Sequence, residues 1–275
     1  MIKKIYFINA NGTTIHIQEA GNGFPIVFVH AGIANLEMWE QQVNFLADNY
    51  RAVAYDMRGF GKSPTASGEF AHYQDLISLL NQLDIPKCIL VGCSKGGGVV
   101  MDTALADPER IAGMIVAGGM AYGLELDSES EPPPQWEQAV SAFKAGDIPL
   151  TNEMEIQIWV DGYNQPVGRA DPQVREKVRK MNEIVLRNEL ATPGAQEKVL
   201  EPKAGTRLNQ ISAPILFIYG SLDEPDIDSA IEKMLREIPG AKRRTIQDVA
   251  HMSNMEKPEE FNQIMLEFIE TVLQS

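Results

Sequence analysis

The chain has 275 residues, of which 44% are hydrophobic and 23% are charged, and its formal net charge is −14. This composition is typical of a globular protein and excludes a chain that is disordered, collagen-like or coiled-coil throughout. The length allows one large domain, or one domain that carries an insertion. Because an acidic surface repels phosphate groups, we expect no general nucleic-acid binding and no docking on an anionic membrane.

The two cysteines, Cys88 and Cys93, lie five positions apart. On one strand they would face opposite sides of a sheet at roughly 16 Å, which is too far for a disulfide. Unpaired thiols indicate a reducing compartment. No apolar stretch at the N-terminus is long enough for a signal peptide, and no run approaches the roughly 18 apolar residues of a membrane span. These features predict a cytoplasmic protein.

The first 120 residues alternate between strand and helix patterns. A half-exposed antiparallel pair is predicted at 4–8 and 13–18, around the turn formed by Asn11 and Gly12. Fully apolar runs, typical of buried parallel strands, follow at 25–30, 52–55, 88–92 and 113–117. Helical patterns lie between them at 37–48, 73–83 and 95–106. This alternation predicts an α/β fold with a mostly parallel sheet and helices on both faces.

The alternation stops near residue 121. Residues 127–134 (DSESEPPP) are acidic and then proline-rich, so they cannot form a helix or a central strand. Helices without any intervening strand are predicted across 135–200, at 135–145, 152–161 and 172–189. Strands then return at 214–219 and 243–247, with helices at 227–237 and 259–272. We therefore expect one α/β domain, made of residues 1–120 and 208–275, and a helical insertion at 121–207.

The strongest chemical signal is the sequence GCSKG at 92–96, which fits the pattern G-x-S-x-G. It lies directly after a predicted strand and before a predicted helix, which is the context of a nucleophile elbow. Such a turn strains its central residue, Ser94, and requires neighbours without side chains. A glycine-rich turn with an incidental serine is the alternative. Neither a dinucleotide-binding loop nor a phosphate loop fits the spacing, because Ser94 and Asp56 stand where glycines are required.

A serine nucleophile needs a base and an orienting acid. Of the four histidines, only His251 lies late in the chain and just after a predicted strand, where the catalytic groups of open sheets collect. Asp223 follows the strand predicted at 214–219. Three further acidic residues nearby are alternatives to it: Glu224, Asp226 and Asp228. No cluster of histidine, cysteine and aspartate has the spacing of metal ligands.

Five motifs in order resemble those of the α/β-hydrolase superfamily, over almost the whole chain. They are VHAG at 29–32 with Trp39 beyond it, DMRGFGKS at 56–63, the elbow, GSLD at 220–223 and HMSNMEKP at 251–258. The resemblance implies the α/β-hydrolase fold, with a mostly parallel eight-stranded sheet and an inserted helical cap at 121–207. The order Ser94, Asp223, His251 is that of the family's triad.

The resemblance also implies a role for each site residue. Ser94 would attack an acyl carbon, His251 would move the proton, and Asp223 would hold the imidazole. The backbone N–H groups of Gly32 and Lys95 would form the oxyanion hole. No cofactor is implied. Candidates for the substrate pocket are Trp39, Trp159, Tyr163 and Met120, although the aromatic residues of the cap could equally form its own core.

Three positions depart from the family pattern. Ala31 and Ala250 replace glycines that are usual in relatives, and Lys95 stands where Met, Gln or His is more common. The Lys95 ammonium could favour carboxylate substrates or act on the His251 imidazole. Alternatively, it extends to solvent or pairs with a glutamate of the cap.

A serine at position 94 excludes the dehalogenases and epoxide hydrolases of this superfamily, which use an aspartate there. We therefore expect a serine hydrolase, similar to carboxylesterases and enol-lactonases, that cleaves small carboxylic esters or lactones. The alternatives are a vinylogous carbon–carbon bond hydrolase, a cofactor-free perhydrolase, and a triad-bearing ligand receptor with little turnover. The sequence leaves the identity of the substrate and the oligomeric state open.

Overall fold

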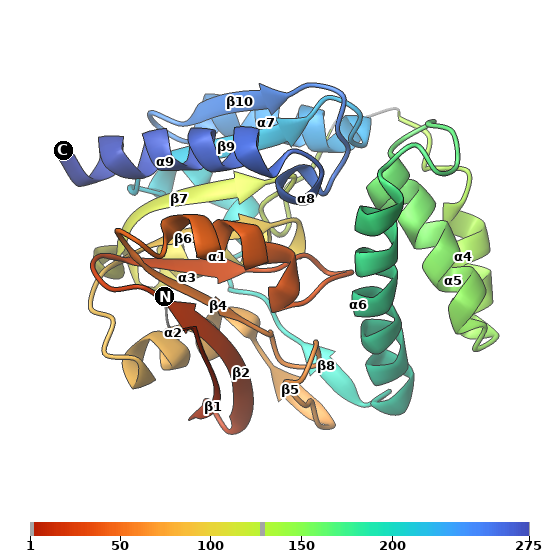
Figure 1. Cartoon of the computed structure of the whole chain (residues 1–275), viewed down its shortest axis with the longest axis horizontal. Coiled ribbons are helices and arrows are strands. Elements are labelled where there is room, and N and C mark those ends of the chain that lie inside the picture. The colour runs from red at the N-terminus through yellow and green to blue at the C-terminus, as the bar shows by residue number, and fades with distance from the viewer. Residues whose placement is uncertain (1–2, 127–129, 275) are drawn as a thin grey trace.

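An eight-stranded sheet runs through the computed structural model, which describes residues 3–126 and 130–274 (Figure 1). The strands are β1 (Lys4–Ala10), β2 (Thr13–Ala20), β3 (Pro25–Val29), β4 (Arg51–Tyr55), β6 (Cys88–Cys93), β7 (Ile111–Ala117), β9 (Ile215–Gly220) and β10 (Lys242–Ile246). Their spatial order is β1-β2-β4-β3-β6-β7-β9-β10, and only the pairs that involve β2 are antiparallel. The predicted mostly parallel eight-stranded sheet is confirmed.

The turn between β1 and β2 forms where the sequence predicts it. Asn11 and Gly12 have φ angles of 47° and 73°. Positive φ at both central residues is the requirement of a two-residue hairpin turn whose twist matches its strands. The hairpin adds an antiparallel edge to the otherwise parallel sheet.

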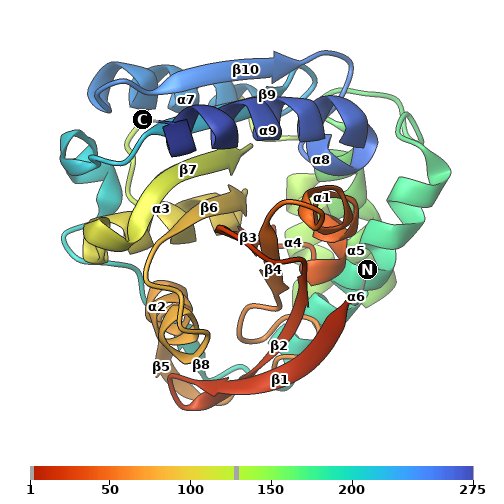
Figure 2. The ribbon, with the colours of Figure 1, turned by 60° about the vertical axis from the view of Figure 1, so that its left-hand side comes forward.

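Helices cover both faces of the sheet, which twists strongly from β1 to β10 (Figure 2). One apolar cluster lies under α1 (Glu40–Leu46) and α9 (Pro258–Gln274). A second lies under α2 (His72–Gln82), α3 (Lys95–Ala106) and α7 (Pro225–Glu237). Alternate residues of each central strand enter different clusters, so both faces must be apolar. Five short helical segments lie between these elements: η1 (Leu36–Trp39), η2 (Pro108–Arg110), η4 (Ala204–Thr206), η5 (Leu208–Gln210) and α8 (Ser253–Glu256).

The chain between β7 and β9 contributes a separate group of helices. These are α4 (Trp136–Lys144), α5 (Ile148–Ile156), the π-helical segment η3 (Gln157–Asp161) and α6 (Pro172–Ala191). They stand beyond the end of the sheet toward which the parallel strands point (Figure 1). α5 and α6 each begin at an aspartate, Asp147 or Asp171, whose carboxylate accepts a backbone N–H of the first turn. Residues 127–129 of the predicted linker lie outside the described residues.

One expectation for this region is wrong. A short strand, β8 (Ala195–Glu197), interrupts the stretch from 135 to 200 that the sequence predicts to be free of strands. It pairs in parallel with another three-residue strand, β5 (Gly68–Phe70). Neither segment has the alternation of a half-buried strand, so neither has a local signal, and each forms because the other is within reach. The Lys198 N–H extends the pairing by donating to the Phe70 carbonyl at 2.7 Å.

No helix within the described ranges combines the length and the apolar character that crossing a membrane requires.

Candidate active site

Ser94 lies in a strained turn between β6 and α3. Its φ and ψ angles are 52° and −116°, which L-residues rarely adopt. The glycines around it allow the close approach: a Cβ on Gly92 would lie 2.3 Å from the Gly96 carbonyl oxygen, and a Cβ on Gly96 would lie 2.3 Å from that of Val29. The strand-to-helix context predicted for this motif is therefore present, and the Ser94 side chain is half-buried.

The structure brings His251 and Asp223 into direct contact. Asp223 follows β9 and His251 follows β10, two neighbouring parallel strands. The His251 Nδ1 atom lies 3.0 Å from each carboxylate oxygen of Asp223, and both residues are buried, with exposed fractions of 3% and 5%. Among the described residues, the His251 Nε2 atom has no hydrogen-bond partner. Asp223 thus holds the ring through one nitrogen, and the other nitrogen has no such contact within the described part of the chain.

The alternative acids have other surroundings. Asp228 forms an ion pair with Arg243 at 2.7 Å, and Asp226 accepts a hydrogen bond from the Ser130 hydroxyl. Burial raises the pKa of Glu224, whose backbone N–H donates to the Asp223 carboxylate at 2.8 Å. Asp223 is therefore the member of this group whose carboxylate contacts the imidazole.

Two small residues fit closely against the His251–Asp223 pair. Gly118, at the end of β7, has a φ of 55°, and a Cβ there would lie 2.9 Å from His251 Nδ1 and 3.1 Å from an Asp223 oxygen. The Cys93 Sγ atom lies 4.0 Å from the His251 carbonyl oxygen. Burial raises the pKa of the Cys93 thiol, so this side chain stays protonated and packs as a small apolar group.

The two residues expected at the oxyanion hole are neighbours. A Cβ on Gly32 would lie 3.7 Å from the Cβ of Lys95 and 3.9 Å from its Cε. The loop that carries Gly32 is held by His30, whose Nδ1 atom lies 2.8 Å from the Ala31 carbonyl oxygen and whose Nε2 atom accepts the Met57 N–H at 2.9 Å. Burial lowers the pKa of His30 to about 4, so the ring is neutral and structural.

Asp56 connects this loop to the segment at 56–63. Its carboxylate accepts the backbone N–H groups of Leu36 and Lys62, each at 2.8 Å. The Nδ1 atom of the buried His16 lies 2.7 Å from the same carboxylate. A Cβ on Gly61 would lie 2.2 Å from an Asp56 oxygen, so only glycine fits there. Asp56 therefore stabilises the backbone of both segments.

The four candidates for the substrate pocket lie in different surroundings. Trp159, on η3, packs on the His251 ring at a centroid distance of 4.7 Å. Tyr163 is half-buried, and its N–H donates to the Leu222 carbonyl at 3.2 Å, next to Asp223. Met120 is half-buried against the apolar core. The expectation for Trp39 is wrong, because this side chain is fully buried between Phe28 and Phe261.

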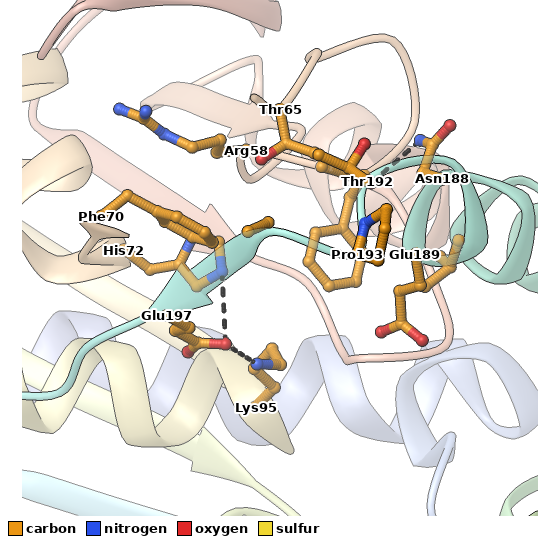
Figure 3. Close-up of a pocket in the computed structure, with 14 residues that line it drawn as sticks. Arg58, Thr65, Phe70, His72, Lys95, Asn188, Glu189, Thr192, Pro193 and Glu197 are labelled. Carbon is orange, nitrogen blue, oxygen red and sulfur yellow. Dashed lines mark hydrogen bonds and ion pairs between the residues drawn. The ribbon is translucent and has the colours of Figure 1, made fainter. Parts of the chain in front are cut away.

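The Lys95 side chain also lines a cavity of about 270 Å³ (Figure 3). Lys95 and Glu197 form an ion pair at its floor, and His72 lies beside them. Phe60, Phe70 and Asn188 contribute further walls. Among the described residues that line it, none of the four sequence-based pocket candidates is present. Glu197 cannot be recognised from the sequence because β8 has no local signal, although the sequence allows Lys95 to pair with a glutamate of the cap.

No group of three or more metal-binding side chains occurs within residues 3–126 and 130–274.

Comparisons with known proteins agree with this geometry. The family described as alpha/beta hydrolase fold matches residues 25–258. The chain is 29% identical to 3-oxoadipate enol-lactonase 2 of Acinetobacter baylyi, over 86% of this chain and 85% of that protein. It is 26% identical to the pimeloyl-[acyl-carrier protein] methyl ester esterase of Aeromonas hydrophila, over 93% and 99%. Among solved structures, Est816, described as an N-acyl homoserine lactone degrading enzyme, superposes with a TM-score of 0.75 at 25% identity, over 96% and 100%.

Proposed function

Since the chain belongs to the alpha/beta hydrolase fold family, we propose that it is a serine hydrolase that cleaves small carboxylic esters or lactones through an acyl-enzyme on Ser94. One observation carries this proposal. A buried His251–Asp223 pair, whose Nε2 atom has no partner among residues 3–126 and 130–274, stands at the same edge of the sheet as a serine held in a strained strand-to-helix turn. This is the set of groups that activates a hydroxyl for acyl transfer.

Each residue then has a defined task. The Ser94 hydroxyl attacks the carbonyl carbon while His251 Nε2 takes its proton and afterwards returns it to the leaving oxygen. Asp223 keeps the proton of the imidazole on Nδ1, 3.0 Å away, so that Nε2 is the basic atom. The N–H groups of Lys95, at the start of α3, and of Gly32 stabilise the oxyanion. Water then hydrolyses the acyl-enzyme with the same base.

We also assign residues 121–207 to a cap over this site. The ring contact between Trp159 and His251 supports this assignment, as does the hydrogen bond from Tyr163 to Leu222. A cover of this kind keeps water away from the reacting groups and strengthens their electrostatic interactions. The names of the relatives, which describe lactonases and an esterase, support ester or lactone bonds as the target.

The test is hydrolysis of short-chain p-nitrophenyl esters together with labelling by a fluorophosphonate. Ser94→Ala and His251→Ala should each lower kcat about 10⁴-fold or more, because members of a triad act as a unit. Asp223→Asn should also lose most activity, since the wrong tautomer is then favoured. Ser229→Ala changes an exposed serine of α7 and should keep wild-type rates.

Turnover that survives Ser94→Ala would refute the acyl-enzyme. Labelling of Ser94 without hydrolysis of any ester or lactone would contradict the ester assignment and point to a carbon–carbon bond substrate or to a receptor with little turnover. Activity that appears only when hydrogen peroxide is added would identify a perhydrolase.

A further inference from the structure

Lys95 belongs to two neighbouring sites at once. Its backbone N–H is part of the proposed oxyanion hole, while its side chain runs beside Gly32 and lines the cavity. The side chain ends in the ion pair with Glu197 of β8, and 28% and 26% of the two side chains are exposed (Figure 3). A substituent that extends from the ester carbonyl into this cavity would therefore pass along Lys95 and meet the ion pair.

The position of Glu197 is set by backbone pairing. Glu197 lies opposite Phe70 in the β5–β8 pair, and the next residue donates its N–H to the Phe70 carbonyl at 2.7 Å. The carboxylate is thus presented to Lys95 from a strand that is itself attached to the core.

The ion pair leaves the floor of the cavity without net charge. The His72 Nε2 atom lies 3.8 Å from the Glu197 carboxylate. Burial, and to a smaller degree the charge of Lys95, lowers the pKa of His72 well below its usual value, so this ring is neutral. The Arg58 guanidinium, also at the cavity, forms two hydrogen bonds with Asp75 at 2.7 and 2.9 Å. Every cation among the described lining residues therefore has an acidic partner.

Other lining groups suit a polar but uncharged group. Phe60 and Phe70 supply apolar wall, and Thr65 and Asn188 supply neutral polar atoms. Glu189 adds a second carboxylate to the lining. Burial raises the pKa of the Glu189 carboxyl group, which favours its uncharged form. An anionic substituent would therefore meet Glu197 without a free cation to bind, and a cationic one would meet Lys95.

We propose that this cavity is the subsite for one substituent of the ester, and that the Lys95–Glu197 ion pair makes the enzyme selective for uncharged substituents. This proposal rests on the serine hydrolase function proposed above. Each partner of the pair cancels the attraction that the other would exert on a charged substrate. Removing Glu197 should therefore favour anionic substituents, and removing Lys95 should favour cationic ones.

The experiment compares esters of similar length whose terminal group is anionic, neutral or cationic, at constant ionic strength. On the acyl side they are methyl hydrogen glutarate, its amide analogue methyl 5-amino-5-oxopentanoate, and methyl 5-aminopentanoate. On the alcohol side they are O-acetylglycolate and O-acetylglycolamide. The measured quantity is the ratio of kcat/KM for the charged ester to kcat/KM for the amide. For the wild type, we expect this ratio to be about 0.1 or lower in at least one series.

The two single variants should move the ratios in opposite directions. In Glu197→Gln the free ammonium of Lys95 should raise the carboxylate-to-amide ratio about 10-fold. In Lys95→Met the free carboxylate of Glu197 should lower that ratio and raise the ammonium-to-amide ratio about 10-fold. The double variant should lie near the wild type, because removing both partners leaves the charge of the cavity unchanged. If the ion pair had only a structural role, the two single variants would instead lower kcat/KM for all the esters together.

Glu69→Gln is the matched control. Glu69 lies on β5, in the same two-stranded sheet, and pairs with Lys198 at 3.0 Å outside the cavity. This variant removes the same charge from the protein and should leave every ratio within two-fold of the wild type. If Glu197→Gln does not fold, as judged by circular dichroism, then Lys95→Met carries the test with the cationic ester.

Ratios that stay within two-fold of the wild type in both single variants, while amide turnover still depends on Ser94, would overturn the selectivity proposal and leave the hydrolase function intact. Amide turnover that does not depend on Ser94 would instead refute the hydrolase function. An equal shift in Glu69→Gln and Glu197→Gln would also overturn the proposal, since the effect would then come from overall charge.

Discussion

Ser94 has a φ of 52° and a ψ of −116°, and a residue in such a sparsely populated region costs roughly 1–3 kcal/mol. The fold maintains it because the Ser94 N–H donates to the Ala117 carbonyl of β7 at 2.9 Å, and its carbonyl accepts the Gly97 N–H at 2.8 Å. The strained backbone holds the residue at the point where a strand becomes a helix. At the scale of single residues, the geometry of this turn depends on positions such as Gly92 and Gly96, where only glycine fits.

Asp102 is a buried carboxyl group whose pKa links the stability of the protein to pH. It lies on α3, is 1% exposed, and accepts the Leu200 N–H at 2.9 Å through one oxygen. Burial raises its pKa from 3.8 to about 6, although the hydrogen bond from Leu200 opposes this shift. Because the pKa is higher in the folded than in the unfolded state, the stabilising contribution is present below about pH 4 and is lost as the pH rises through 6.

Asp102→Asn keeps an oxygen that can accept from Leu200 and removes the charge. We therefore expect this variant to gain about 1–2 kcal/mol of unfolding free energy relative to the wild type as the pH rises from 4 to 8. Urea unfolding at several pH values measures this difference. A difference between the two proteins that does not change with pH would show that Asp102 does not carry the titration.

At the scale of elements, the helical segment between β7 and β9 is attached to the site by backbone and side-chain contacts. Arg169 is central among them: it donates to the Val160 carbonyl at 2.8 Å and to the Asp248 carbonyl at 3.1 Å. It also pairs at 2.6 Å with Glu256, whose second carboxylate oxygen accepts the Ala250 N–H at 2.7 Å. One guanidinium thus connects the end of η3 to the loop that carries His251.

Arg169→Met should break this connection. We expect a loss of about 2–3 kcal/mol in unfolding free energy, because several buried acceptors lose their donor. The kcat of the ester reaction should fall about 10-fold, since the His251 loop and Trp159 are no longer held together. Arg169→Lys should not restore either quantity, because an ammonium cannot reproduce the planar fork.

The matched control is Arg187→Met, on α6. Arg187 forms an exposed pair with Glu183 one turn away, and its loss should change stability by less than about 0.5 kcal/mol. Equal effects of the two variants on kcat would argue against a special role for Arg169.

At the scale of the whole molecule, the formal charge of −14 affects how substrates approach. A strongly acidic protein lowers the local concentration of anions, and salt screens this repulsion because the Debye length falls from ~30 Å at 0.01 M to ~8 Å at 0.15 M. Raising the ionic strength over this range should therefore increase kcat/KM for an anionic ester about 2–5-fold. The amide analogue, measured under the same conditions, should stay constant; a parallel change in both would indicate a salt effect on the enzyme.

Much of the architecture follows from local patterns. The helix predicted at 95–106 is observed as α3 with the same bounds, and the apolar runs predicted as strands all lie in the large sheet. Local patterns succeed here because a strand buried on both faces must be continuously apolar, and because a tight strand-to-helix turn requires small residues at fixed spacing. An apolar side chain such as Trp39 can line a pocket or pack in the core, and local patterns do not distinguish the two. In the structure, Trp39 packs in the core.

By itself, the sequence determined the alternation of strands and helices, the elbow at Ser94 and the order in which the candidate triad appears along the chain. The tertiary structure alone decided which carboxylate reaches His251, that Trp159 packs on the imidazole, and that Lys95 pairs with Glu197. The physical reason is the range of the interactions. Periodicity and turn chemistry are properties of neighbouring residues, whereas these contacts join residues from separate elements that meet only when the sheet and its helices have assembled.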